Sequence, residues 1–260
     1  MIRASVANQK GGVGKTALSC HQGLSLAEQG FKVLFIDNDP QGNSSYTLQK
    51  NSMTTLAPFK TIQLYESTPL PDFQPETPIT LVAADRSLSK VARFETEAPF
   101  IFREHLDKLG DKFDYCVMDN PPTLGLGLIA SLVSSDFVYS PIEIEDYSIS
   151  GLEQLQQTIA GVKSRHNPNL KYLGMIPNRM NTRDNRQKEK LKKLLQHFSD
   201  KIIKAPVVQR SSISEALGKG LPIWEMQKER SAAKQATEEI RAALDFIESQ
   251  MGVKKQTEEA

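Results

Sequence analysis

The sequence predicts an α/β protein whose mostly parallel, doubly wound sheet is flanked by helices. Short apolar segments of strand length alternate along the chain with segments of helical periodicity, and this alternation is typical of successive βα units. Residues 32–36 read Lys-Val-Leu-Phe-Ile, an almost wholly apolar run of the kind that is buried on both faces of a parallel sheet. Polar motifs follow directly after several of these runs, at the strand ends where such sheets bind ligands.

The first expected elements are a strand at 4–8, a glycine-rich loop, and a helix over about 16–29 that ends before Gly30. After the strand at 32–36, residues 51–78 are rich in Thr and Pro, so we expect a loop with short helical pieces. Further elements are expected as strands at 79–83, 115–118, 137–140, 172–176 and 202–205, and as helices at 100–109 and after a capping box at Ser150 to Glu153.

Length and composition favour one cytoplasmic domain. With 260 residues and 39% hydrophobic content, the chain can bury one sizeable core, and no linker or repeat divides it. We therefore expect a single domain over 1–260, with a disordered tail from about residue 251. Cys20 and Cys116 offer neither a disulfide framework nor a metal cluster. No apolar run of the sequence approaches the roughly 20 residues of a membrane span, and the first residues lack the pattern of a signal peptide.

Residues 10–16, Lys-Gly-Gly-Val-Gly-Lys-Thr, predict a phosphate-binding loop. The backbone N–H groups of such a glycine-rich run turn toward one anion, and the following helix adds its positive dipole end. Lys15 supplies a point charge to the β- and γ-phosphates, and Thr16 offers a hydroxyl to Mg²⁺. The strict pattern GxxxxGK(S/T) is not met, because it requires glycine at position 9, where this chain has Gln9. The alternative, a glycine turn with two solvated lysines, is disfavoured by the position of the loop between a strand and a helix.

Three aspartates follow apolar strands, where they can serve a metal ion. Asp37 and Asp39 stand two residues apart after the second strand, a spacing that suits a hydrated Mg²⁺ and an attacking water. Asp119 follows the strand at 115–118 in the arrangement of a Walker B carboxylate, which fixes Mg²⁺ through water. Taken alone, the first pair also fits a turn, because Asp-Pro and Gly-Asn favour turns, and Asp119 also fits a structural strand end.

The loop KGGVGKT resembles the deviant Walker A motif of the ParA/MinD family of ATPases. The resemblance extends over almost the whole chain, through the segments ANQKGGVGKT, IDNDPQGNSSYTL, PPTLGLGL, SPIEIEDYSISGL and RSSISEAL, which are similar to ParA-type DNA partition proteins. Among these, the sequence resembles the IncC type of IncP plasmids. The resemblance implies a P-loop NTPase fold that binds ATP or ADP together with Mg²⁺.

The resemblance also implies roles for individual residues. Lys10 is expected to reach across a dimer interface to the partner's nucleotide, and Asp39 to position the hydrolytic water, so that Lys10, Lys15 and Asp39 form the catalytic set. Asp37 and Asp119 are expected to hold the metal ion together with Thr16. The residues implied in nucleotide binding are Lys10, Gly11, Gly12, Val13, Gly14, Lys15, Thr16 and Ala17 in the loop, Asn178 and Arg179 at the adenine, and Pro206 in the base pocket.

Some positions depart from the family or remain open. Ala17 stands where most of the family has a second threonine, so one contact to the α-phosphate is expected to be missing. Asn120 replaces a residue that is often small in relatives. Asn178 also fits a polar strand-end cap, an alternative that the sequence leaves open.

Basic residues are concentrated in the second half of the chain. Residues 1–160 hold 12 Lys/Arg and 19 Asp/Glu, whereas residues 161–260 hold 20 and 12, although the net charge is only +1. Such asymmetry is typical of a surface for nucleic acid or an acidic partner, and a solvated helix face explains it equally well. Together with the resemblance it favours non-specific DNA binding through phosphate contacts. The candidate residues are Arg183, Arg186, Arg210, Lys228, Arg230 and Lys234.

The resemblance thus implies a Mg²⁺-dependent ATPase that forms an ATP-dependent homodimer, binds DNA non-specifically, and drives plasmid or chromosome partition with a ParB-type partner. Hydrolysis is expected to be slow without that partner, and the protein to be cytoplasmic and associated with the nucleoid in its ATP state. The alternatives are a ParA-like cargo-positioning ATPase and a MinD-like membrane-positioning ATPase, of which the polar residues 251–260 disfavour the second. Because the first strand begins almost at residue 1, we expect no amino-terminal operator-binding helix-turn-helix.

Overall fold

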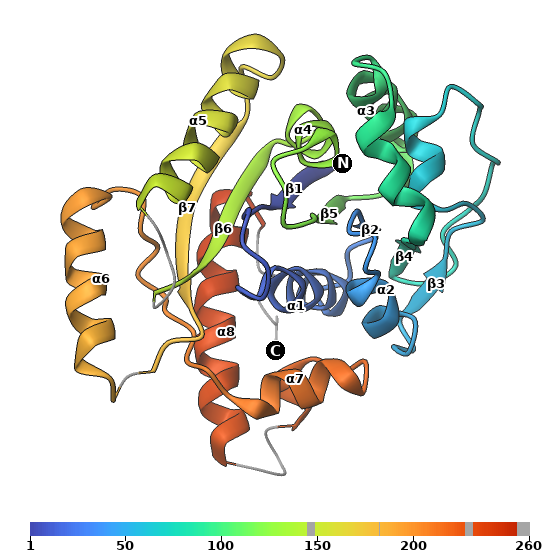
Figure 1. Ribbon diagram of the computed structural model, residues 1–260. Helices are drawn as coiled ribbons and strands as arrows, with labels where there is room; N and C mark the ends of the chain where they lie inside the picture. The colour runs from blue at the N-terminus through green and yellow to red at the C-terminus, as the bar shows by residue number, and fades with distance from the viewer. Residues whose placement is uncertain (145–148, 182, 227–230, 254–260) are drawn as a thin grey trace.

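The computed structural model describes residues 1–144, 149–181, 183–226 and 231–253. Within these residues, seven strands form one sheet in the order β3-β4-β2-β5-β1-β6-β7, and every neighbouring pair is parallel (Figure 1). The strands are β1 (Ile2–Val6), β2 (Val33–Asp37), β3 (Thr54–Leu56), β4 (Ile79–Val82), β5 (Tyr115–Asp119), β6 (Phe137–Glu143) and β7 (Lys171–Asn178). The predicted doubly wound parallel sheet is confirmed.

Helices cover both faces of this sheet (Figure 1). The helices on one face are α1 (Lys15–Glu28), α7 (Ser211–Gly218) and α8 (Ser231–Gln250). Those on the other face are α3 (Ala98–Lys108), α4 (Leu126–Val133) and α5 (Ile149–Arg165). The other described helical segments are α2 (Asn43–Leu48), α6 (Asn185–His197), and the 3₁₀ turns η1 (Thr61–Tyr65), η2 (Arg86–Arg93), η3 (Gly110–Lys112) and η4 (Ile223–Met226).

The apolar strands divide their side chains between the two faces. Phe35 of β2 and Val117 of β5 pack into the core beneath α1 and α8, whereas the next residues, Ile36 and Met118, pack into the core beneath α3. All four side chains are fully buried. Burial on both faces explains why these strands form continuous apolar runs instead of alternating with polar residues.

Three details of the predicted elements are different in the structure. Residues 54–56 form β3 beside β4, inside the stretch that was expected to be a loop, although η1 supplies the short helical piece expected there. The strand predicted at 202–205 is wrong, because it reduces to one bridge between Met175 and Ile202, and Pro206 has no N–H with which to continue a ladder. The capping box at Ser150 is wrong as well, because α5 already includes the preceding residue.

The end of the chain packs further than predicted. Met251 is only 3% exposed and belongs to the core cluster beneath α1 and α8, so the packed chain extends past the predicted start of the tail. Residues 254–260, where most of that tail falls, lie outside the described residues. Among the described helices, none has the length and apolar character needed to cross a membrane.

Candidate active site

The carboxyl ends of the central strands bring the predicted site residues together. The loop at 10–16 leads from β1 into α1, and Asp37 and Asp119 are the last residues of β2 and β5. Strand β5 lies between β1 and β2, and its register pairs Asp119 with Asp37 on one side and with Val6 on the other. The loop, Asp37 and Asp119 therefore lie together at the carboxyl end of the sheet, where α1 begins.

The glycine-rich loop has the geometry of an anion cradle. Gly12 and Gly14 have φ angles of 76° and 95°, in the left-handed region that favours glycine. A Cβ atom on Gly14 would lie 1.9 Å from Nδ2 of Asn178, so glycine is required there. No described side chain caps the N-terminus of α1, so its first N–H groups and its positive dipole end are available to an anion.

Lys15 places a cation at the same point. Its side chain is buried, and its Nζ donates a hydrogen bond to the carbonyl of Lys10 at 3.0 Å across the loop. Burial lowers the pKa of Lys15, while the negative charges of Asp119 and Asp39 act in the opposite direction. A phosphate at the loop would supply the negative charge that this buried ammonium lacks.

Asp37 and Asp119 form a pair of buried carboxylates. Their side chains are 0% and 1% exposed. Asp37 Oδ2 accepts hydrogen bonds from the backbone N–H and the hydroxyl of Ser45, both at 2.7 Å, and Asp119 Oδ2 accepts one from the Thr16 hydroxyl at 2.7 Å. Burial and the nearby charge of Asp37 raise the pKa of Asp119 to about 7. Burial raises the pKa of Asp37 as well, against the effect of its hydrogen bonds.

The pair has the chemistry of a divalent-cation site. Asp119 Oδ1 is buried and accepts no hydrogen bond from the described residues, which leaves an acceptor that a cation would satisfy. Oxygen ligands from two carboxylates and one hydroxyl suit Mg²⁺, which keeps several waters and takes further oxygens from substrate phosphates. No cluster of three or more His, Cys, Asp or Glu stands elsewhere among the described residues as a competing metal site. Asp37, Asp119 and Thr16 therefore fit the predicted magnesium site.

Asp39 follows two residues after Asp37, in the turn beyond the end of β2. It is half-buried, its Oδ1 accepts the N–H of Gln41 at 2.9 Å, and its own N–H donates to Asp37 Oδ1 at 3.2 Å. Its negative charge acts to raise the pKa of Lys15 against the effect of burial. A carboxylate oriented in this way can hold and polarise a water molecule next to a phosphate.

A cavity of about 430 Å³ extends from the loop toward α7. It is lined by residues of the loop and of α1, by Asn178 and Arg179 at the end of β7, and by residues 208–211, 213 and 214. In this structure Asn178 Nδ2 donates to the carbonyl of Val13 at 2.7 Å, so the amide braces the loop. Pro206 is exposed and does not line this cavity, whose wall begins two residues later at Val208, so a contact of Pro206 with the base stays a prediction.

Comparisons with known proteins agree with this geometry. A family model described as "AAA domain" matches residues 2–172. The chain is 37% identical over 258 residues to the protein IncC of Escherichia coli, which covers 95% of this chain and 69% of IncC. It is 32% identical over 227 residues to the sporulation initiation inhibitor protein Soj of Bacillus subtilis, covering 84% of this chain and 88% of Soj.

The chain belongs to the ParA-type partition ATPases. The predicted resemblance to this family, including the IncC type, is confirmed. Two solved structures share the fold of this ParA-type ATPase. The cobyrinic acid a,c-diamide synthase of Mycobacterium smegmatis, with bound ADP and magnesium, has a TM-score of 0.72 at 25% identity and covers 88% of this chain and 96% of its own. An ATP complex of a Cyanothece McdA variant has a TM-score of 0.81 at 20% identity and covers 99% of each chain.

The early lysine of the ParA-type loop contacts a carboxylate of its own chain. Lys10 Nζ lies 3.3 Å from Glu143 Oε2 at the end of β6, and Arg179 NH1 lies 3.6 Å from Glu143 Oε1. Arg179, whose φ of 53° is left-handed, also donates to the carbonyl of Gly12 at 3.0 Å. Glu143 therefore forms ion pairs with both Lys10 and Arg179. Glu143 was not predicted from the sequence, although it ends an apolar strand as Asp119 does.

The predicted DNA-binding residues fall into three groups. Arg183 and Arg186 are exposed next to or on α6, and Lys234 is exposed on α8. Lys228 and Arg230 lie outside the described residues. Arg210 is different, because it is paired within the chain and mostly buried, and its assignment as a DNA contact stays a prediction. It forms a two-pronged ion pair with Glu239 of α8 and lines the cavity, with its side chain only 15% exposed. A cation paired in this way braces the cavity wall instead of facing solvent.

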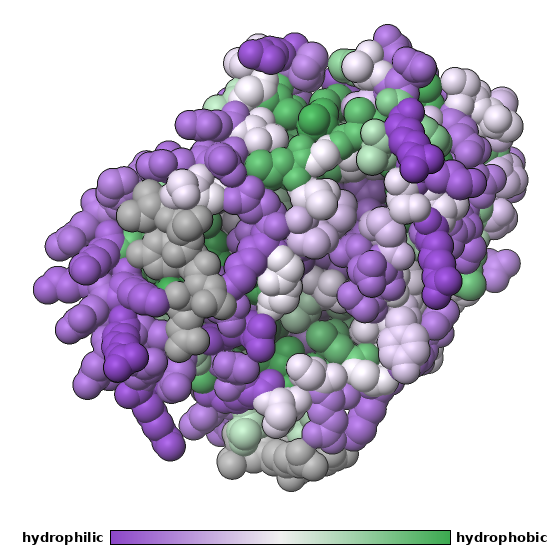
Figure 2. Space-filling model, in the orientation of Figure 1, coloured by the Kyte–Doolittle hydropathy of each residue, from purple (hydrophilic) through white to green (hydrophobic). Residues whose placement is uncertain are grey.

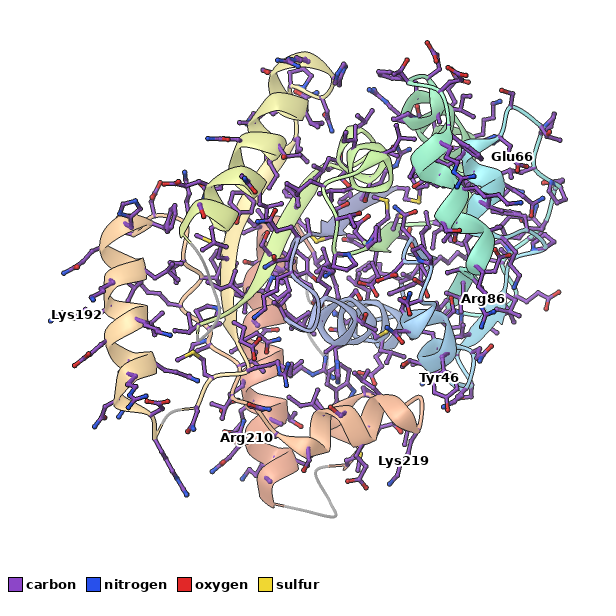
Figure 3. All side chains as sticks on the ribbon, viewed as in Figure 1. Tyr46, Glu66, Arg86, Lys192, Arg210 and Lys219 are labelled. Atoms are coloured by element: carbon purple, nitrogen blue, oxygen red, sulfur yellow. The ribbon has the colours of Figure 1, made fainter. Side chains whose placement is uncertain are left out.

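Helix α6 presents the clearest basic surface of the ParA-type chain. Asp184 caps it by accepting the N–H of Arg186 at 2.8 Å, and its apolar side packs against the edge of the sheet through Leu191, Leu194, Leu195 and Phe198. Hydrophilic side chains cover the outer side of α6 in Figure 2, and Lys192 points away from the protein in Figure 3. The exposed cations on α6 are Arg186, Lys188, Lys190, Lys192 and Lys193.

Replacing Asp119 by asparagine is expected to stabilise the protein against unfolding when no divalent cation is present. At pH 8 the substitution removes one of two facing buried negative charges and keeps an acceptor for Thr16. We expect a gain of at least about 1 kcal/mol, or roughly 2–4 °C in melting temperature for a protein of this size. Thermal unfolding followed by circular dichroism in EDTA measures it.

The matched control for this prediction is Asp114→Asn. Asp114 is exposed and accepts the N–H of Lys32 at 2.8 Å, so its replacement removes a carboxylate that is not opposed by another buried charge. It should give no stabilisation. A melting temperature of Asp119→Asn below that of the wild type would contradict the proposed repulsion between the two buried carboxylates.

Proposed function

We propose that this chain, acting as a single ATPase domain over 1–260, hydrolyses ATP to ADP and phosphate with Mg²⁺ and drives the partition of a plasmid or chromosome region. The observation that carries the proposal is the buried pair of Asp37 and Asp119 beside an uncapped helix N-terminus and a buried Lys15. Such a site matches a metal-bound polyphosphate in charge and in ligand type. The IncC and Soj relatives, and the ADP and magnesium of the synthase with the same fold, support the same proposal.

The residues divide the work of phosphoryl transfer among them. The loop N–H groups and Lys15 bind and orient the phosphates, while Thr16, Asp37 and Asp119 hold the metal ion. When bound, Mg²⁺ neutralises the charge that develops on the phosphate oxygens. Asp39 orients the attacking water and accepts its proton. The adenine and ribose occupy the cavity between Ala17 and residues 208–214.

Hydrolysis by the single chain is slow because a residue of a second chain is needed to complete the site. In the single chain, Lys10 Nζ lies 3.3 Å from Glu143 Oε2 of the same chain. We propose that ATP brings two chains together so that Lys10 of each contacts the nucleotide of the other, and that a ParB-type protein and DNA stimulate turnover. The dimer binds DNA non-specifically, so the cytoplasmic protein associates with the nucleoid in its ATP state and leaves it after hydrolysis.

Asp39→Ala is expected to abolish ATP hydrolysis while nucleotide binding is retained. The substitution removes the group that orients water but leaves the phosphate and metal ligands in place, so kcat should fall on the order of 10²-fold or more. Phosphate release with Mg²⁺ and DNA measures kcat, and a fluorescent ATP analogue measures affinity. The control Asp72→Ala removes an exposed carboxylate remote from the site, paired with Lys112, and should turn over normally. Unchanged hydrolysis by Asp39→Ala would remove Asp39 from the mechanism.

Lys10→Ala is expected to keep nucleotide binding in the single chain but to prevent ATP-dependent dimerisation. Lys15 and the loop N–H groups remain to bind the phosphates, whereas the variant has no lysine with which to reach across the interface. Sedimentation velocity with ATP and Mg²⁺ measures the dimer, and DNA binding and hydrolysis should fall with it. Lys108→Ala, which removes an exposed lysine of α3, serves as the control. If Lys10→Ala dimerises and hydrolyses ATP as the wild type does, the role of Lys10 is refuted.

The double variant Arg186→Ala/Lys192→Ala is expected to weaken binding to DNA of any sequence. For each phosphate-binding cation that is removed, the slope of the logarithm of the DNA-binding constant against the logarithm of the salt concentration should fall in magnitude by about one. Fluorescence anisotropy with ATP at several salt concentrations measures both quantities. A matched pair, Lys108→Ala/Lys163→Ala, removes two exposed lysines from α3 and α5 and should leave the slope unchanged. Equal slopes for the α6 variant and the wild type would exclude α6 as the DNA surface.

A further inference from the structure

Two buried asparagines connect the segments that carry the metal and water ligands. Asn38 stands between Asp37 and Asp39, and Asn120 follows Asp119 directly. Their side chains are 3% and 0% exposed, and Asn38 Nδ2 donates to Asn120 Oδ1 at 3.1 Å. A hydrogen bond between side chains thus joins the two residues that directly follow Asp37 and Asp119.

The amide of Asn38 is fully used in this bridge. Its Nδ2 also donates to the carbonyl of Gly127 in α4 at 2.9 Å, and its Oδ1 accepts the hydroxyl of Tyr65 at 2.6 Å. Asn38 can make these three bonds in only one orientation of its amide, because the nitrogen donates and the oxygen accepts. The Tyr65 hydroxyl fixes that orientation.

Asn120 extends the network toward the loop. Its Nδ2 donates to the carbonyl of Val6 at 3.1 Å, at the end of the strand from which the phosphate-binding loop starts. The chain of hydrogen bonds therefore runs from η1 through β2 and β5 to β1, with a branch to α4. A buried polar network of this kind is costly unless every member is paired, and when paired it specifies one geometry.

Packing alone does not determine the position of these segments. A cavity of about 200 Å³ lies against Asn38, Pro40 and Pro121 and continues to Gly125 and η2. The residues that follow Asp37 and Asp119 therefore border open space on one side. The side-chain hydrogen bond between Asn38 and Asn120 and the bond from the Asn38 N–H to the Asp119 carbonyl at 2.8 Å connect the two segments beyond the strand pairing.

We propose that Asn38 and Asn120 are positioning residues for ATP hydrolysis, an inference that rests on the proposed function. The pair sets the distance between Asp39, which orients the water, and the segment at 120–123, of which Pro121 and Thr123 line the cavity of about 200 Å³. Asp37 has its own support from Ser45, so loss of the bridge displaces Asp39 and Pro121 more than the metal ligands. Catalysis is sensitive to such displacement, since an error of about 1 Å can cost on the order of 10²-fold in rate.

The test compares kcat with nucleotide affinity in Asn38→Ala, Asn120→Ala, the double variant and Tyr65→Phe. Steady-state phosphate release with Mg²⁺ and DNA gives kcat and KM, a fluorescent ATP analogue gives Kd, and thermal unfolding is recorded for each variant. We expect kcat to fall on the order of tenfold to 10²-fold in each alanine variant, with Kd within about threefold of the wild type. The loss in the double variant should be smaller than the product of the two single losses, because both substitutions break the shared hydrogen bond between Asn38 and Asn120.

Asn167→Ala is the matched control. Asn167 Nδ2 also donates to two carbonyls, those of Leu132 and Ser135 at 2.9 and 2.6 Å, and Asn167 stands before β7, away from the carboxyl ends of the strands. It should lose thermal stability without losing kcat, which separates a structural effect from a positioning effect. Tyr65→Phe, which keeps the ring and removes only the bond that orients Asn38, should lower kcat several-fold with unchanged Kd.

Three results decide the proposal. Wild-type kcat values in folded Asn38→Ala and Asn120→Ala, or additive losses in the double variant, overturn it. If the alanine variants do not fold, Tyr65→Phe decides, and a wild-type kcat in that variant overturns it. A wild-type protein that hydrolyses no ATP in the same assay overturns the proposed function instead, so the two failures are distinguishable.

Discussion

The repulsion between two buried carboxylates is the constraint on which the site depends. Asp37 and Asp119 end neighbouring parallel strands, so the register of the sheet places them side by side, away from water. Burying two like charges is unfavourable unless a cation compensates them. Positive charge comes from the buried Lys15 and from the dipole end of α1. Asp119 Oδ1, which accepts no hydrogen bond from the described part of the chain, also leaves a ligand position for a divalent cation. The fold thus keeps an electrostatic cost that bound metal and nucleotide relieve.

The other groups of the site lie beside this pair, at the carboxyl ends of the strands. Parallel strands bring every βα loop of the central strands to one side, so that groups from β1, β2, β5, β6 and β7 meet there although they are far apart in sequence. Asn38 and Asn120 tie the two carboxylate-bearing segments together. Glu143 pairs with Lys10 and Arg179. The groups that we propose for phosphate binding, metal coordination and water orientation therefore come from separate elements of one sheet.

Sequence patterns predicted the parts of this arrangement that are local. The apolar run of β2, the glycines of the loop and the aspartates after two strands each carry their signal within a few residues, and the sheet and the site edge follow from them. The pairing of Arg210 with Glu239, of Lys10 with Glu143, and of Asn38 with Asn120 joins residues that are 29, 133 and 82 positions apart. Such pairings depend on packing, so Arg210 reads as a free cation, and the bridge of asparagines has no signal in the sequence.

The most direct test of the account is whether Asp37 and Asp119 hold a divalent ion only when nucleotide is bound. Electron paramagnetic resonance of Mn²⁺, used in place of Mg²⁺, counts the bound ions with and without a non-hydrolysable ATP analogue. The account predicts one tightly bound ion per chain with the analogue and loss of that ion in Asp119→Asn. Equal Mn²⁺ binding by the wild type and Asp119→Asn, with the analogue bound to both, would contradict it.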